Sequence, residues 1–359
     1  MLDGAIDIQR LRQYFNLAVR VRQTWEAARR DAGFVTSVRR GLLPLPFDER
    51  PVPPSPIFPP TESRPLPSLA GRRIGLVATG GSGVLASVVG VVRALEEAEL
   101  RPAVLSLCSG SALFGFPVAA GLSAEETAQF TARLHPPDYV RLSAGPLLRA
   151  PFTLGRGFSG FLRGEHVEEL YRGLLGDRRL GDLEIPAYAV VWNGDQDRLE
   201  YLGPATHPDV PVATAVRLAI TLPLMLESAE FEGGQWFDGG VVDIFPVAPV
   251  LDIEPACDLV IGVNGFYPSG FGGRDITGWL ERRASIMVLA DQVRTMQHVH
   301  VARMNLARLE RETQVLMLQP VADEEAAGVG LYRHFLDTSR WVEFMRAGLD
   351  SARDALATL

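Results

Sequence analysis

Two stretches in the first half of the chain repeat the same order of apolar run, small polar turn and helical spacing. The first has an apolar run at 74–78 and a glycine-rich turn at 80–83, followed by apolar residues at helical spacing. The second has an apolar run at 103–107, a turn at 108–111 and a helical pattern from Leu113. Such a repeat predicts neighbouring parallel strands, whose turns lie at one edge of the sheet. The two turns are therefore expected to face one site.

The pattern from residue 71 onward continues this alternation of strands and helices. It predicts helices at 166–175, 212–222, 276–312 and 341–356, and strands at 185–192, 259–265 and 314–319. Ser123, with Glu126 three residues later, is typical of a capping box at a helix start. Asn193-Gly194-Asp195 between two strand-like runs predicts a hairpin. The alternation indicates an α/β fold in which a mostly parallel sheet has helices on both faces.

The first 70 residues have a different pattern. Residues 5–40 place apolar side chains near one face and arginines elsewhere, which predicts an amphipathic helical arm over residues 1–43. Ten prolines between Pro44 and Pro67 exclude a regular helix or a central strand. Residues 44–70 are therefore expected to form a linker or a strap on the surface. The main domain is then expected at 71–359.

The arm at 1–43 has two open roles. It can pack on its own domain or on the second subunit of a homodimer, or it can make a peripheral contact with an anionic membrane surface. We favour packing because an apolar stripe of this kind more often covers protein than lipid.

Composition narrows the class of protein. With 359 residues, 47% hydrophobic and 22% charged, the chain has enough apolar surface for a large core and does not have the composition of a disordered protein. The net charge of −8 argues against nucleic acid as a partner. No window reaches the roughly 18 apolar residues of a membrane helix, and the start lacks a signal-peptide core. Cys108 and Cys257 do not make a disulfide framework. We therefore expect a cytoplasmic protein.

The two polar turns contain the groups needed for acyl transfer. A serine at a sharp turn between strand and helix is held clear of its neighbours, and the helix N-terminus behind it favours negative charge. The backbone N–H groups of Gly81, Ser82 and Gly83 can donate to a substrate oxyanion as it forms. Ser109 and Ser111 both lie in the second turn, so either is a candidate nucleophile.

These turns resemble the patatin-like acyl hydrolases, whose pattern is a glycine-rich oxyanion loop, a helix and a G-x-S-x-G serine turn. Alignment on the shared pieces at 91–97 and 121–126 places the family's nucleophile on Ser109. The resemblance implies a three-layer α/β/α fold and a lipid or phospholipid ester as substrate. It also implies that the oxyanion loop consists of Gly80, Gly81, Ser82 and Gly83.

The serine turn departs from the family pattern at three positions. The first motif glycine is Leu107 here, the second is Ser111, and the loop's usual arginine or lysine is Val84. A leucine before the serine needs room for its side chain. Either the turn is looser than in the family or the register shifts by two and Ser111 attacks; we favour Ser109.

The run at 235–247 contains Asp238-Gly239-Gly240 and resembles the family's D-G-G motif, including the Pro-Val that follows. Alone, an Asp-Gly pair indicates only a turn. The resemblance implies that Asp238 is the second half of a Ser-Asp dyad, since a carboxylate bonded to a serine hydroxyl can accept its proton. Asp243 is the fallback. This chemistry needs no metal and no cofactor.

The resemblance also implies a hydrophobic cleft beside the acyl site. The residues expected to line it are Phe152, Leu154, Phe158 and Phe161, although each is as well explained by filling of the core.

Three other functions fit parts of the sequence. Residues 81–86 match the G-x-G-x-x-A dinucleotide fingerprint, but the next strand ends without the acid that holds a ribose. A Ser-Asp-His triad is available through His298, His300 or His334. Since Asp238 supplies a base without histidine, we expect all six histidines to be dispensable for proton transfer.

The third alternative is a degenerate hydrolase fold that binds acyl chains or a partner without turnover. Leu107 and the missing loop arginine favour it. The presence of Ser109, Asp238 and the loop at 80–83 together favours a serine acyl hydrolase, which is our prediction.

Overall fold

The computed structural model describes residues 53–60, 62–142, 159–266, 271, 286–326, 334–335 and 337–359. The chain divides into two compact units, Met1–Glu49 and Arg50–Leu359, and every described residue belongs to the second. The predicted helical arm at 1–43 therefore lies outside the described residues. Phe152, Leu154, Phe158 and the side chain of Phe161 lie outside them too, so the predicted cleft stays a prediction.

An eight-stranded sheet forms the centre of the second unit. Five neighbouring strands are parallel: β11 (Gln314–Leu318), β10 (Leu259–Val263), β1 (Ile74–Ala78), β2 (Pro102–Leu107) and β5 (Ala187–Asn193). Three antiparallel strands complete it: β6 (Arg198–Leu202) and β9 (Gly234–Asp238), which both pair with β5, and β8 (Ala229–Phe231), which pairs with β9. Strands β1 and β10 are buried at every position, which explains their continuous apolar sequences.

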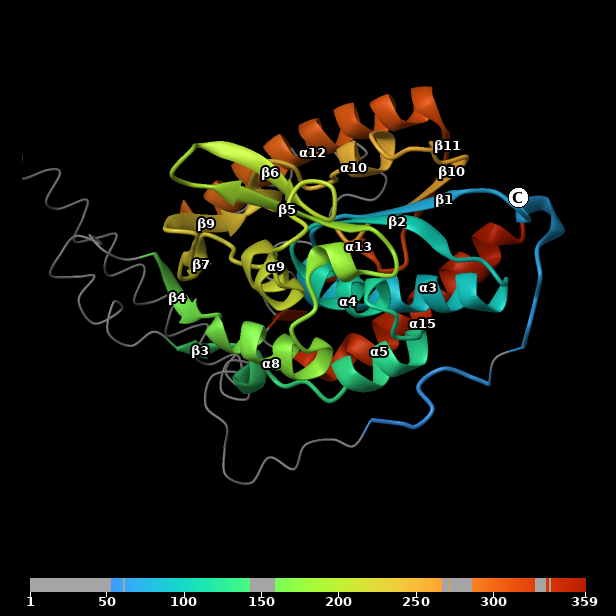
Figure 1. Ribbon diagram of the computed structural model, residues 1–359, viewed down its shortest axis with the longest axis horizontal. Helices are drawn as coiled ribbons and strands as arrows, with labels where there is room; N and C mark the ends of the chain where they lie inside the picture. Colours follow the sequence, from blue (N-terminus) through green and yellow to red (C-terminus); the bar gives the residue numbers. More distant parts are fainter. Residues whose placement is uncertain are drawn as a thin grey trace, which may run out of the picture. The chain divides into compact units, whose positions relative to one another are not determined.

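Helices cover both faces of this sheet (Figure 1). On one face lie α3 (Ser87–Glu97), α4 (Gly110–Ala119), α5 (Ala124–Thr131), α8 (Glu165–Leu175), α9 (Val212–Ala219) and α15 (Trp341–Leu356). On the other lie α10 (Ala248–Leu251) and α12 (Ile286–Glu312). The predicted three-layer α/β/α fold with a mostly parallel sheet is confirmed.

Short elements complete the described chain. A second, three-stranded sheet contains β3 (Arg141–Leu142), β4 (Gly160–Arg163) and β7 (Leu224–Leu226). Short helices and turns are η1 (Pro67–Leu69), η2 (Ser82–Ala86), α6 (Pro136–Tyr139), η3 (Leu180–Asp182), η4 (Gly239–Val241), α13 (Asp323–Ala326) and η6 (Thr338–Arg340). Within the described ranges, no helix combines the length and apolar character required to span a bilayer.

The local predictions around the two repeats agree with the structure. Strands β1 and β2 pair in parallel, with Val77 opposite Ser106. The Ser123 hydroxyl accepts from the N–H of Glu126, whose carboxylate accepts from the N–H of Ser123, so the predicted capping box is present. Strands β5 and β6 form the predicted hairpin.

The described part of the proline-rich segment packs on the domain as a strap (Figure 1). Ile57 and Phe58 are buried, and their N–H groups donate to the Glu125 carboxylate at 2.8 and 3.1 Å. Arg346 of α15 donates to the carbonyl of Ile57 at 3.1 Å. Backbone polar groups that a proline-rich chain cannot pair within itself are thus paired by side chains of the domain.

A buried ion-pair network joins α3 to α15. The carboxylate of Glu97 is almost fully buried and accepts from Arg353 at 2.8 and 2.9 Å and from Arg93 at 3.1 Å. Burial acts to raise the pKa of Glu97, but the hydrogen bonds and charge of Arg353 and Arg93 outweigh it, so the pKa is lowered. This network fixes the closing helix of the chain on the first helix of the sheet.

Candidate active site

Ser109 occupies a strained turn between β2 and α4. Its backbone has φ 52° and ψ −123°, a conformation that residues other than glycine rarely adopt. Such strain at a strand-to-helix turn keeps a serine side chain exposed in front of the helix N-terminus. The side chain of Ser109 is partly exposed, whereas its neighbours Cys108 and Gly110 are buried.

The room that Leu107 needs is provided by a glycine on α4. Leu107 is fully buried against Gly115, where a Cβ atom would lie only 2.6 Å from Cδ2 of Leu107. The leucine is therefore accommodated without displacing the turn that follows it.

The surroundings of Ser111 indicate a structural role for its hydroxyl group. It is fully buried, and its Oγ accepts from the N–H of Cys108 at 2.7 Å and donates to the carbonyl of Cys108 at 2.8 Å. The hydroxyl thus closes the turn around Ser109 and is directed into the protein.

The glycine loop lies directly against the serine turn. A Cβ atom on Gly110 would lie 2.4 Å from the carbonyl oxygen of Ser82, so the two turns touch through their backbones. The N–H group of Gly80 donates to the carbonyl of Ile244 at 3.1 Å. Gly81 and Ser82 follow Gly80 and line the same cavity as Ser109, whereas Gly83 lies against the carbonyl of His334.

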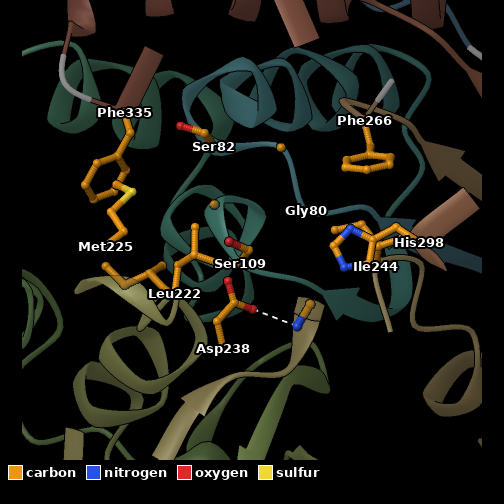
Figure 2. Close-up of a pocket in the computed structure, with 14 residues that line it drawn as sticks. Gly80, Ser82, Ser109, Leu222, Met225, Asp238, Ile244, Phe266, His298 and Phe335 are labelled. Carbon is orange, nitrogen blue, oxygen red and sulfur yellow. Dashed lines mark hydrogen bonds between the residues drawn. The ribbon is translucent and has the colours of Figure 1, made fainter. Parts of the chain in front are cut away.

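Asp238 lies at the end of β9, opposite Val191 of β5, and is 1% exposed. Its N–H donates to the carbonyl of Thr221 at 2.9 Å, and its Oδ1 accepts from the N–H of Gly240 at 2.7 Å. Figure 2 shows the other carboxylate oxygen directed toward Ser109. The turn at Gly239 and Gly240 therefore fixes one oxygen and presents the second to the serine.

The carboxylate of Asp243, the alternative candidate base, is occupied by hydrogen bonds to other side chains. Its carboxylate accepts from the hydroxyl of Tyr201 at 2.7 Å and from the side-chain amide of Asn305 at 2.8 Å. Burial raises the pKa of Asp243, and these hydrogen bonds oppose that shift. The three side chains tie β6 and α12 to the segment that follows Asp238.

Ser109, Asp238 and the loop surround a small cavity of about 50 Å³ (Figure 2). The polar side of its wall consists of Gly80, Gly81, Ser82, Ser109, Gly110, Asp238 and Gly240. The remaining wall consists of Ile220, Leu222, Met225, Ile244, Phe266, His298 and Phe335. A volume of this size admits a few small groups, such as a carbonyl and its nearest atoms.

The apolar wall could not be identified from the sequence. Leu222 and Met225 flank the proline that ends α9, while Phe266 follows β10 and Phe335 lies far toward the C-terminus. The apolar pattern of each of these segments is the same as that of segments in the protein core. Only Leu222 had a local signal, because it directly precedes Pro223 at the carboxyl end of a predicted helix.

One of the three histidines considered for a triad lines the cavity. His298 on α12 is buried, and its Nε2 lies 3.2 Å from the carbonyl oxygen of Val241. His300 is exposed, and His334 is bonded to Glu325 at 2.6 Å. Of these three, His298 alone belongs to the cavity wall.

A family model described as patatin-like phospholipase matches residues 76–251. The chain therefore carries a patatin-like phospholipase domain. The matched range runs from β1 to the end of α10 and includes Ser109 and Asp238. The predicted resemblance is confirmed, and the match supports lipid acyl hydrolase activity in general.

Relatives of the patatin-like phospholipase domain occur in mycobacteria. Uncharacterised NTE family proteins of Mycobacterium bovis and Mycobacterium tuberculosis are 25% identical over 193 residues, which is 54% of this chain and 49% of each relative. The chain thus spans about half the length of the curated relatives it matches. The crystal structure of VipD from Legionella pneumophila aligns with 83% of this chain and 70% of that chain, at 15% identity and a TM-score of 0.44.

The matched range of the patatin-like phospholipase domain does not contain the whole cavity. Phe266, His298 and Phe335 follow its last residue, Leu251, yet they line the wall around Ser109. The C-terminal part of the chain therefore supplies one side of the candidate site.

Proposed function

We propose that the chain is a serine acyl hydrolase for lipid or phospholipid esters, with Ser109 as nucleophile and Asp238 as base. The observation that carries this proposal is the strained backbone of Ser109, φ 52°, at a cavity that also contains Asp238 and the glycine loop. Backbone strain of this kind is costly and is typical of catalytic turns.

In the proposed reaction, Ser109 Oγ attacks the carbonyl carbon of the ester while the Asp238 oxygen that is directed toward Ser109 takes the hydroxyl proton. In this proposal the N–H groups of Gly81, Ser82 and Gly110, which line the cavity, stabilise the oxyanion that forms, and Gly83 stays a predicted member of the loop. The intermediate then releases the alcohol, which takes the proton from Asp238, and leaves an acyl group on Ser109. Asp238 next activates water, which hydrolyses the acyl group and restores the serine.

A fluorophosphonate probe tests the nucleophile directly, because it reacts covalently with an activated serine. We expect a single adduct on Ser109 in peptide mass spectrometry, lost in Ser109→Ala and retained in Ser111→Ala. An adduct on Ser111 would move the nucleophile by two residues. A folded protein that takes no adduct on either serine would support the degenerate, binding-only alternative.

His298 gives a second candidate mechanism, because it lines the cavity with Ser109 and Asp238. If Asp238 is the general base, His298→Gln should keep kcat on a soluble p-nitrophenyl ester within about tenfold of the wild type. A loss of about 10³-fold or more would instead indicate general base catalysis by the histidine. His300→Gln, on the exposed face of the same helix, is the matched control.

A further inference from the structure

Residues 241–245, which we call the linking segment, follow the turn after the proposed base. The N–H groups of Val242 and Asp243 both donate to the carbonyl of Gly239 at 2.9 Å. The linking segment and the turn are therefore one hydrogen-bonded unit, and a shift of the segment moves the turn with it.

The linking segment also contacts the other two parts of the candidate site. The carbonyl of Ile244 accepts from the N–H of Gly80, the first residue of the glycine loop, at 3.1 Å. The thiol of Cys108, directly before Ser109, lies 3.6 Å from the carbonyl oxygen of Asp243 and donates to it. The base, the loop and the serine turn are thus all bonded to one stretch of five residues.

One face of α12 carries four residues at spacings of four, three and four, which are His298, Ala302, Asn305 and Leu309. Ala302 and Leu309 are 0% exposed, His298 is 4% exposed and Asn305 is half-buried, so this face is directed inward. The inward face of a helix is normally apolar. Two polar side chains among these four positions indicate that the face does more than fill the core.

Both polar side chains bond to the linking segment. The Nε2 atom of His298 donates to the carbonyl of Val241 at 3.2 Å. The side-chain amide of Asn305 donates to the carboxylate of Asp243 and to the carbonyl of Phe245, each at 2.8 Å. The first residue, the middle and the last residue of the segment are therefore fixed to one helix.

We propose that His298 and Asn305 are positioning residues, which act through the linking segment on the geometry of the candidate site. The proposal rests on the proposed function for the roles of the base, the loop and the serine. A displacement of about 1 Å between reacting groups can lower a rate by about 10²-fold, even when its cause lies far from the chemistry. Loss of either side chain therefore lowers turnover although neither takes part in proton transfer.

Asn305→Ala removes two of these hydrogen bonds. It should lower kcat on a soluble p-nitrophenyl ester by about 10- to 100-fold. KM should change by less than about threefold, because the described cavity wall does not include Asn305. Thermal unfolding confirms that the variant is folded at the assay temperature. Asn305→Leu, which keeps the volume of the side chain, replaces it if the alanine variant does not fold.

His298 is tested by a pair of substitutions. His298→Leu removes the donor to Val241, whereas His298→Gln keeps an N–H donor at the end of the side chain. We expect kcat of His298→Leu to be at least about tenfold below that of His298→Gln. Equal losses in the two variants would show that the hydrogen bond to Val241 does not matter.

Amide hydrogen exchange tests the same idea without catalysis. In Asn305→Ala, the N–H of Gly80 should exchange at least about tenfold faster than in the wild type, because its acceptor lies on the linking segment. This response is expected even though Asn305 is bonded to a different part of that segment. Peptides from α15 should exchange at the rate of the wild type.

Arg308→Ala is the matched control on α12. Arg308 lies three residues beyond Asn305 and pairs at 3.9 Å with Asp252, which lies outside the linking segment. Its loss should change kcat and the exchange of Gly80 by less than about twofold.

Two results would overturn the inference. One is a folded Asn305→Ala whose kcat and Gly80 exchange match the wild type. The other is an equal effect of Arg308→Ala, which would assign the loss to a general loosening of α12. Faster exchange of Gly80 in Asn305→Ala, in a protein whose wild type takes no fluorophosphonate, would instead refute the proposed function alone.

Discussion

At the scale of single residues, the two acids after β9 have opposite environments. Asp238 has one oxygen bonded to Gly240 and the other directed toward Ser109, whereas both oxygens of Asp243 accept hydrogen bonds from Tyr201 and Asn305. The sequence alone could not separate them beyond the D-G-G resemblance. Because the hydrogen-bond partners of the two acids differ, substitution of each acid tests which one is the base.

We expect Asp238→Asn to lower kcat on a soluble p-nitrophenyl ester by about 10²- to 10⁴-fold with little change in stability, because the amide oxygen can still accept from Gly240. Asp243→Asn should keep kcat within about tenfold. It should lower the free energy of unfolding in urea by about 1–3 kcal/mol, because an amide has one acceptor oxygen for the two donors, Tyr201 and Asn305. The reverse pattern of activity would make Asp243 the base.

The altered serine motif has its own test in the contact between Leu107 and Gly115. We expect Gly115→Ala to destabilise the protein by about 1–3 kcal/mol, since the added methyl group would overlap the buried leucine. Leu107→Ala alone should cost about 2–5 kcal/mol by leaving a cavity. The double variant should be more stable than the sum of the two effects predicts, as measured by urea unfolding in a double-mutant cycle. Additive losses would show that Gly115 does not make the room for Leu107.

Motif and periodicity could predict Ser109, Asp238 and the loop because each of these lies in a short, recognisable stretch. His298, Phe266 and Phe335 could not be assigned to the cavity, since they reach it from segments distant in sequence. The two phenylalanines follow the same apolar pattern as any buried side chain. His298 was considered only as one of three histidines, and its place in the wall depends on how α12 crosses the sheet.

At the scale of elements, strands with continuous apolar sequence and long helices were predicted well. The short strands β3, β4, β7 and β8 were not, because two to four residues carry no measurable period. The packing of α3 on α15 was also beyond the sequence. It depends on an ion pair between Glu97 and Arg353, which are 256 residues apart.

The Glu97 network predicts a pH dependence of stability. The pKa of Glu97 is lowered from its ordinary value of 4.5, so the charged form is favoured by folding. The stability that it contributes is present above about pH 4.5 and is lost as the pH falls through the folded-state pKa. Glu97→Gln should cost about 3 kcal/mol at pH 7, because it removes the negative charge that Arg93 and Arg353 share in the buried network.

The measurement is urea unfolding of the wild type and Glu97→Gln between pH 7 and pH 3. We expect the difference between them to shrink once the pH falls below about 4.5. Glu62→Gln, an exposed carboxylate paired with Arg64, is the control and should change stability by less than about 0.5 kcal/mol. A difference that is constant across the range would show that Glu97 is not charged in the network.

At the scale of the whole molecule, the proline-rich segment shows what composition can and cannot predict. In its described part, residues 53–60 and 62–66, no helix or strand forms, as the prolines predicted, but a free linker and a packed strap have the same composition. Ile57 and Phe58 decide between them, because both are 1% exposed and their N–H groups are paired with Glu125. Both residues belong to the compact unit Arg50–Leu359, and a domain start at 71 stays a prediction.

Two shortened chains test the contribution of the strap to stability. A chain of residues 50–359 keeps Ile57, Phe58 and Leu69 buried, whereas a chain of residues 71–359 loses all three. We expect the shorter chain to be less stable by roughly 5 kcal/mol in urea unfolding, from the apolar area that it no longer buries. Phe58→Ala in the longer chain should reproduce about 3 kcal/mol of this loss. Equal stability of the two chains would mean that the strap contributes nothing and that the domain begins at 71. A loss in the shorter chain that Phe58→Ala does not reproduce would assign the contribution to the other strap contacts.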